Sequence, residues 1–408
     1  MLKSIRLFDL LLVVHMFGVS IASLLFAAEP AVFAAIFLVT ALPLIATAFL
    51  STESIGTGRL CIYGLAFFLP LCVGYFLNPL SVDPIVRLII VFLIFGIGWI
   101  CSSMRAYTAT TNAFLLAGAI GLIVAFFMLS REGLSEAIED GARLTGGEES
   151  HPNFIGLTMV CVALCANVHR YAIVRYAGSL MGFGLSLAVQ SRNAILALIV
   201  LMGISAFRDV RRKLGWGGIG FFILLGILAM LVAFTLMENI VSEIFRLDDP
   251  YRGTGSGFVG RAQLWQATWE LFTAHPFVGF GLGQHVIGAH LEMYAHNMYL
   301  IILSESGLLG FMTFLVGCGI AALGLNHLRK TESADLNYLI STMIYCIIIY
   351  YVYGIFEGRA INAGNLLSYL FFFALGFGIS AFSRQVSSTR APAPVYARPA
   401  ERELFPYT

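Results

Sequence analysis

Charged residues are scarce in this chain. Aspartate, glutamate, lysine and arginine make up 12% of its 408 residues, and 59% of the residues are apolar. Soluble domains carry roughly 25% charged and about 45–50% apolar residues. The scarcity excludes an ordinary soluble domain and predicts an integral membrane protein. The net charge of +1 identifies no partner, and we expect membrane lipid and no nucleic acid around the chain.

Cysteines outside apolar segments are also lacking. All seven lie in or at the ends of apolar runs, so neither a disulfide framework nor a zinc-binding spacing is present. A spaced Asp-x-Asp pair is missing, because Asp248 and Asp249 are adjacent. The segment HPFVGFGLG is neither a dinucleotide fingerprint nor a Walker A loop. We therefore expect no metal and no cofactor.

Long apolar runs are what the chain has in abundance. A helix needs about 17 to 25 residues to cross the hydrocarbon core of a bilayer. The predicted spans lie near residues 8–28, 31–50, 60–77, 85–101, 113–129, 153–168, 172–190, 193–207, 217–236, 297–322, 338–356 and 364–382. The predicted fold is all-α, with about twelve transmembrane helices.

Basic residues are unevenly divided between the two sides of this plan. With the N-terminus inside, most of the 24 lysines and arginines fall on the inner side, and the acidic residues of two long loops fall outside. Loops rich in lysine and arginine stay in the cytoplasm. We expect both termini to be cytoplasmic and the loops near 130–152 and 237–296 to face outward.

The outer loop between spans nine and ten, 237–296, is too long for a bare connector in a compact domain. We expect it to be structured and functional. Residues 1–382 are predicted to form one polytopic membrane domain, and the Pro-rich segment 383–408 a disordered cytoplasmic tail.

Within that loop, residues 261–274 have the periodicity of an amphipathic helix that lies along the outer membrane interface. Glycines precede the helix, Arg261 stands at its N-terminus, and Pro276 follows its end. A guanidinium beside unpaired helix N–H groups favours an anion such as phosphate. The alternative is that Arg261 reaches for water or pairs with Asp248 or Asp249.

Two more arginines lie on the same outer side. Arg192 occupies a hairpin with almost no connector, where it either snorkels to the interface or belongs to a site, since charge at membrane depth is costly. Arg359 follows the eleventh span and is a candidate for contacts with a substrate. The position of Glu357, two residues away, favours a local ion pair as the role of Arg359.

His296 opens the tenth span. A neutral imidazole there can accept a hydroxyl proton near neutral pH, and the alternative is a helix-end histidine satisfied by backbone or water. His275, His285 and His290 lie nearby, but their spacing fits no usual zinc pattern. Glu305, further along the span, falls on another side of the helix and should not face the site of His296.

The order of these motifs and their places between the predicted spans are similar to those of a known protein family. Ser191-Arg192, then Arg261 with HPFVGFGLG, then HNMYLIILSESGLLG from His296 resemble the bacterial O-antigen ligase and polymerase family. The pair Pro152-Asn153 resembles that family's Pro-Asn motif. The resemblance covers roughly residues 145–325, which we expect to be the catalytic core.

The resemblance implies a membrane glycosyltransferase of the bacterial inner membrane, with its active site facing the periplasm. The donor would be a glycan on undecaprenyl diphosphate, and the acceptor the lipid A core or another glycan chain. Arg192 and Arg261 would hold the diphosphate, and His296 would activate the acceptor hydroxyl in a metal-independent, inverting transfer. Asn153, Asn297 and Arg359 would contact substrate. An exopolysaccharide or O-antigen repeat-unit polymerase remains the alternative within the family.

A transporter or flippase of lipid-linked glycans is the alternative of another class. Transporters place ionisable groups or broken helices near the bilayer midplane. The predicted spans here are nearly free of charge at their centres, Glu305 being the chief exception, and polar residues gather at one outer face. This distribution favours chemistry at the interface.

Overall fold

The computed structural model describes residues 2–25, 30–51, 56–78, 83–131, 152–189, 191–211, 259–291, 294–333, 336–358 and 364–390. Within these ranges the regular structure is helical and no residue lies in a strand. The helices are α1 (Leu2–Leu25), α2 (Pro30–Leu50), α3 (Thr57–Leu77), α4 (Asp83–Ser103), α5 (Tyr107–Arg131), α7 (Pro152–Ala166), α8 (Ala172–Ala188), α11 (Val259–Ala274), α12 (His285–Gly288), α13 (Met298–Thr331), α14 (Leu336–Gly354) and α15 (Leu366–Arg390). A further helix, Arg192–Arg211, follows α8 and is called here the 192–211 helix.

The predicted membrane spans match helices wherever the chain is described. Among these residues, eight helices are long and apolar enough to cross a membrane, and three shorter apolar helices occupy Leu7–Ser23, Asn153–Ala166 and Ala172–Ala188. The ninth predicted span, 217–236, lies outside the described residues, as does the first part of the predicted loop. The chain is thus an α-helical membrane protein, and the total of twelve spans stays a prediction.

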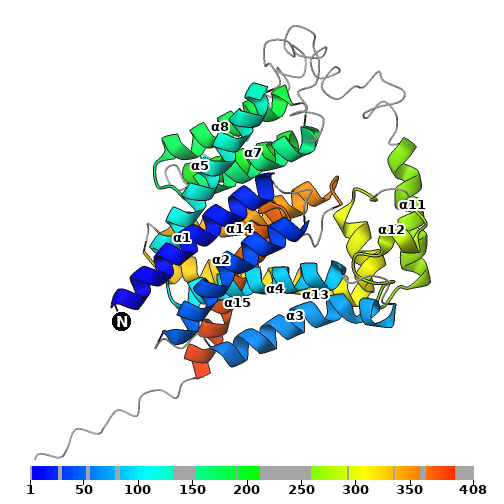
Figure 1. Ribbon diagram of the computed structural model, residues 1–408, viewed down its shortest axis with the longest axis horizontal. Helices are drawn as coiled ribbons and strands as arrows, with labels where there is room; N and C mark the ends of the chain where they lie inside the picture. The colour runs from blue at the N-terminus through cyan, green and yellow to red at the C-terminus, as the bar shows by residue number, and fades with distance from the viewer. Residues whose placement is uncertain are drawn as a thin grey trace, which may run out of the picture.

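The core is built around α15. In the apolar part of this helix 94% of residues are buried inside the protein, so α15 has almost no contact with lipid. It packs against α4, α13 and α14, while α1, α2, α5, α7 and α8 form the neighbouring layer (Figure 1). Glycines at the crossings bring helix backbones together, as in other membrane bundles. Gly98 of α4 faces the Phe373 carbonyl, and Gly324 of α13 faces that of Gly378.

The C-terminal end of α15 lies beyond the predicted end of the membrane domain. The helix continues to Arg390, past the boundary expected at residue 382. Arg384 explains part of this extension, because its guanidinium donates hydrogen bonds to Ser380 (3.2 Å) and to Ser102 of α4 (3.0 Å). Residues 391–408 of the predicted tail lie outside the described residues.

Helix α11 forms where the loop sequence predicts a helix, and it lies at the edge of the molecule with α12 (Figure 1). Its polar residues Gln263, Gln266 and Glu270 are exposed. Thr268, Leu271 and Phe272 on the other side are buried against α13. The amphipathic periodicity of the sequence therefore predicted this helix correctly. Helix α11 ends at Ala274, two residues before Pro276.

Helix α13 differs from the uninterrupted span expected near 297–322. It runs from Met298 to Thr331 but is broken at Gly307, whose backbone angles are φ 62° and ψ −168°. That region is essentially restricted to glycine. The break exists because the turn after α11, residues 276–281, lies against it and takes up its main-chain groups.

Four main-chain hydrogen bonds join this turn to the break: Phe280 N to Ser304 O (2.8 Å), Gly281 N to Glu305 O (3.0 Å), Leu308 N to Pro276 O (2.8 Å) and Leu309 N to Phe277 O (3.0 Å). Non-helical backbone at membrane depth is tolerated only where protein satisfies it. Part of the predicted outer loop is therefore inserted beside α13. Helix α3 supports it, since the Asn78 side chain donates to the Phe280 carbonyl (3.0 Å).

Candidate active site

His296 precedes α13 in an unusual backbone conformation. Its φ of 50° lies in the left-handed region, which few residues other than glycine adopt. The next residue, Asn297, caps the helix: its side-chain oxygen accepts the N–H groups of Tyr299 (3.0 Å) and Leu300 (3.1 Å). The histidine side chain is 35% exposed. Strained backbone of this kind concentrates at functional sites.

Asn297 thus has a structural role as a helix cap, in addition to the substrate contact predicted for it. Its oxygen satisfies two of the N–H groups that every helix leaves unpaired at its start. The cap fixes where α13 begins and so where His296 stands. Contact between the Asn297 side chain and a substrate stays a prediction.

Helix α11 reaches the backbone beside His296. The Trp265 indole N–H donates to the carbonyl oxygen of buried Ala295 at 2.7 Å. Arg261 stands four residues earlier, one helical turn away and on the same side of α11. Its side chain is half-buried. The helix that carries Arg261 is therefore fixed to the residue next to His296.

The end of α14 meets His296 from another direction. The Glu357 carboxylate is 3.8 Å from His296 Nδ1, and it accepts the N–H of Gly358 at 3.1 Å. A Cβ on Gly358 would lie 3.2 Å from the His296 nitrogen, and one on Gly354 would lie 2.7 Å from Met298. These two glycines allow the segment after α14 to pack directly on the start of α13.

Glu357 meets His296, a contact that the sequence does not indicate. Its predicted ion pair with Arg359, two positions away, stays a prediction. The structure directs its carboxylate to His296, and Arg359 lies outside the described residues. The signal in the sequence was only that Glu357 ends a span on the same side as His296, which does not identify a partner.

The 192–211 helix and α7 both begin beside the end of α14. The Asn193 side chain donates to the carbonyl of Phe356 at 3.1 Å, one residue before Glu357. The Tyr353 hydroxyl donates to the backbone carbonyl of Asn153 at 3.3 Å. The helix starts that carry Arg192 and Asn153 therefore lie around the end of α14, next to the residue that faces His296.

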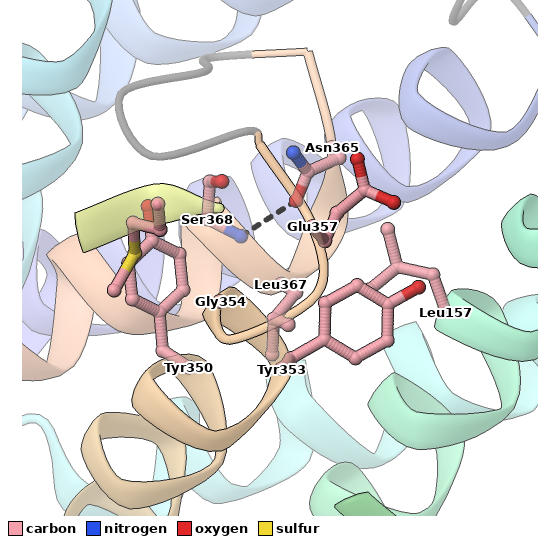
Figure 2. Close-up of a pocket in the computed structure, with 9 residues that line it drawn as sticks. Leu157, Tyr350, Tyr353, Gly354, Glu357, Asn365, Leu367 and Ser368 are labelled. Carbon is pink, nitrogen blue, oxygen red and sulfur yellow. Dashed lines mark hydrogen bonds between the residues drawn. The ribbon is translucent and has the colours of Figure 1, made fainter. Parts of the chain in front are cut away.

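A small pocket, partly open to solvent, lies at this end of α14 (Figure 2). Its lining includes two tyrosines and the carboxylate of Glu357. The lining residues are Leu157, Met298, Tyr350, Tyr353, Gly354, Glu357, Asn365, Leu367 and Ser368. Asn365 accepts the Ser368 N–H at 2.8 Å and starts α15 there. Four helices, α7, α13, α14 and α15, thus line this pocket beside the candidate site.

The other histidines of the segment lie elsewhere. His285 is buried, and its Nδ1 is 2.6 Å from the Glu305 carboxylate. His275 packs on Phe280, with ring centroids 5.4 Å apart, and His290 is exposed. Glu305 therefore faces His285 and not His296, as its position on the helix predicted. Among the described residues no group of three or more metal-ligating side chains is gathered.

Residues 177–315 match the family model described as O-antigen ligase. Over these residues the chain carries an O-antigen ligase domain. The matched segment contains the 192–211 helix, α11, the inserted turn, His296 and the broken part of α13. No curated protein matches the chain.

The match supports an enzyme of polysaccharide biosynthesis, because the proteins of the matched family act on lipid-linked glycans and their acceptors. Arg192, Arg261 and His296 all fall inside the matched segment, whereas Asn153 and Glu357 fall outside it. In the structure Asn153 accepts a hydrogen bond from Tyr353 of α14, and Glu357, just after α14, faces His296 of the matched segment.

Proposed function

We propose that the protein is a glycosyltransferase that moves a glycan from undecaprenyl diphosphate to an acceptor hydroxyl at the periplasmic face of the bacterial inner membrane. The observation that carries the proposal is the meeting of separate elements at His296. Trp265 of α11 contacts the residue before it, Glu357 faces its ring, and Asn193 contacts the segment that holds Glu357.

The roles of the site residues follow from the charge that develops in the reaction. Cleaving the bond between the sugar and the diphosphate releases a leaving group that is already anionic, so fixed positive charge aimed at it lowers the barrier. Arg192 and Arg261 would supply that charge, and each guanidinium can donate two parallel hydrogen bonds to phosphate. Asn153, Asn297 and Arg359 remain candidates for substrate contacts.

His296 would act as the general base. As the acceptor oxygen bonds to the anomeric carbon, the hydroxyl proton passes to the imidazole and the carbon–oxygen bond to the diphosphate breaks. Undecaprenyl diphosphate leaves with the bonding electrons. One displacement inverts the anomeric carbon, so the linkage in the product should be opposite in configuration to that in the donor.

The test uses the purified protein in detergent or nanodiscs, with a diphosphate-linked glycan, an acceptor and EDTA. We expect glycan transfer and release of undecaprenyl diphosphate. His296→Ala should lower the rate by roughly 10²- to 10⁴-fold. His290→Asn is the matched control, because His290 is exposed and left-handed like His296, and asparagine tolerates that conformation.

Full activity of His296→Ala would reject the base assignment, and retention of anomeric configuration would reject the single displacement. Two acceptors separate the alternatives within the family. A ligase adds one chain to the lipid A core, whereas a polymerase given only lipid-linked repeat units makes a ladder of products.

The break in α13 is the one observation that favours a transporter, since broken helices form the binding sites of many transporters. Here the main-chain groups beside the break bond to the inserted turn. A vesicle assay separates the two functions. Movement of a labelled lipid-linked glycan across the bilayer with no new glycosidic bond would support the transporter and contradict the enzyme.

A further inference from the structure

Glu357 occupies a defined position beside the proposed base. Its side chain is only 15% exposed, and its carboxylate lies 3.8 Å from Nδ1 of His296. The neighbouring Gly358 packs against the backbone of His296, which allows no intervening side chain. The acidic group is therefore held near one particular nitrogen of the imidazole.

We infer that Glu357 is a positioning residue for His296: it selects the ring orientation in which Nδ1 faces the carboxylate, and it stabilises the imidazolium formed during transfer. This inference rests on the proposed function. With Nδ1 beside Glu357, Nε2 is the nitrogen that takes the acceptor proton. The proton then gives His296 a positive charge beside a negative one.

The 3.8 Å separation suits a protein without substrate. It is longer than a hydrogen bond but within the range of an ion pair, and a water molecule or a small shift can close it. Catalytic hydrogen bonds often tighten only when substrate is bound. In a site shielded from water, the attraction between carboxylate and imidazolium is stronger than at an open surface.

A purely structural role for Glu357 makes a different prediction. The carboxylate also accepts the Gly358 N–H, which shapes the segment after α14. A glutamine at this position keeps an oxygen for that hydrogen bond and loses only the charge. Glu357→Gln therefore separates positioning of His296 from support of the backbone.

The experiment compares wild-type protein with Glu357→Gln, Glu357→Asp and the control Glu270→Gln in the transfer assay. Glu270 is an exposed carboxylate on α11 that pairs with Gln266 at 3.0 Å. We expect Glu357→Gln to lower kcat by roughly 10- to 100-fold with little change in KM, the loss typical of one charged hydrogen bond. Glu357→Asp should restore part of the rate, and the control should be fully active.

The pH profile gives a readout that a structural role would not move. Among the described residues, the charged groups at the ends of the elements that meet near His296 are Glu357, Arg261 on α11 and Arg192 on the 192–211 helix. Of these three groups Glu357 is the one that favours the imidazolium, so Glu357→Gln should move the acidic limb of the rate profile to lower pH. An unchanged kcat and an unchanged profile, in a variant with wild-type thermal stability, would overturn the inference.

A double variant separates this inference from the proposed function. If Glu357 acts through His296, then His296→Ala combined with Glu357→Gln should be no slower than His296→Ala alone. Additive losses would show that Glu357 acts on its own and would overturn the inference. An active His296→Ala protein would reject the proposed base, whereas an inactive one beside a fully active Glu357→Gln protein would reject only the positioning role.

Discussion

Arg261 shows how a single side chain can be placed by a neighbour that has no part in the chemistry. Trp265, one turn further along α11, bonds to the carbonyl next to His296 and thereby fixes the helix face that Arg261 shares. If Arg261 holds a diphosphate, its guanidinium binds the phosphate oxygens through two parallel N–H donors as well as through its charge. Lysine keeps only the charge.

Arg261→Lys should therefore lower kcat/KM by roughly 10- to 100-fold, the loss of one charged hydrogen bond. Transfer rates measured at several donor concentrations test this. Gln263→Ala is the control on the same helix, because Gln263 is exposed. A lysine variant with the wild-type rate would show that Arg261 does not make a bidentate contact.

Residues whose chemistry is local could be predicted from the sequence, and residues defined by distant contacts could not. The N-terminal position of Arg261 on a helix follows from periodicity and from the glycines before it. The pairing of Glu357 with His296, and of His285 with Glu305, depends on segments that meet only after folding. Asn297 was assigned to substrate, although a polar residue before an apolar run is also the usual signature of a helix cap.

At the scale of elements, the inserted turn and the break in α13 are one structure. Gly307 combines a positive φ of 62° with an extended ψ of −168°. A Cβ at this position would collide with the carbonyl carbon of Phe277. Apolar composition alone predicts an uninterrupted helix. The glycine in SESGLLG was visible in the sequence, but the turn that satisfies the opened backbone comes from a different part of the chain.

Gly307→Ala should destabilise the protein by about 2 kcal/mol or more, from backbone strain and from displacement of the turn. Gly319→Ala in the same helix is the matched control, because a Cβ there meets nothing within 4 Å. Alanine should leave stability unchanged or raise it by about 0.5–1 kcal/mol at that helical position. Thermal unfolding in detergent would measure both, and equal behaviour of the two variants would contradict a required break.

The charged residues at the two ends of the helix bundle have different partners. The 192–211 helix spans ~30 Å, with Arg192 at one end and Asp209 near the other. At the far end Asp209 pairs with buried Arg175, whose guanidinium also donates to the carbonyls of His169 (3.0 Å) and Arg170 (2.8 Å). These contacts hold the loop between α7 and α8 to the helix that follows.

Asp209→Asn should destabilise the fold by about 3 kcal/mol, because it leaves the Arg175 charge buried without its partner. The transfer rate well below the melting temperature should stay near wild type, since this pair lies at the opposite end from His296. Arg329→Ala, which removes an exposed hydrogen bond to Asn326, should cost less than 1 kcal/mol. Loss of turnover in a folded Asp209→Asn protein would show that this end takes part in the reaction.

Hydropathy predicted most of the architecture because a bilayer requires long apolar helices and gives every such segment the same signal. It could not predict that α15 would lie almost wholly inside the protein. Residues that face lipid and residues that face other helices are equally apolar. The small residues that bring α15 against α4 and α13 are the feature that separates them.

The inserted turn has one more consequence. Its four hydrogen bonds to α13 all use main-chain atoms, so the register between α11 and His296 is independent of which side chains the turn carries. Sliding by a single residue would break all four bonds together. Helix α11 is thus anchored to α13 through the backbone, and we expect side-chain substitutions in the turn to leave the position of α11 beside His296 unchanged.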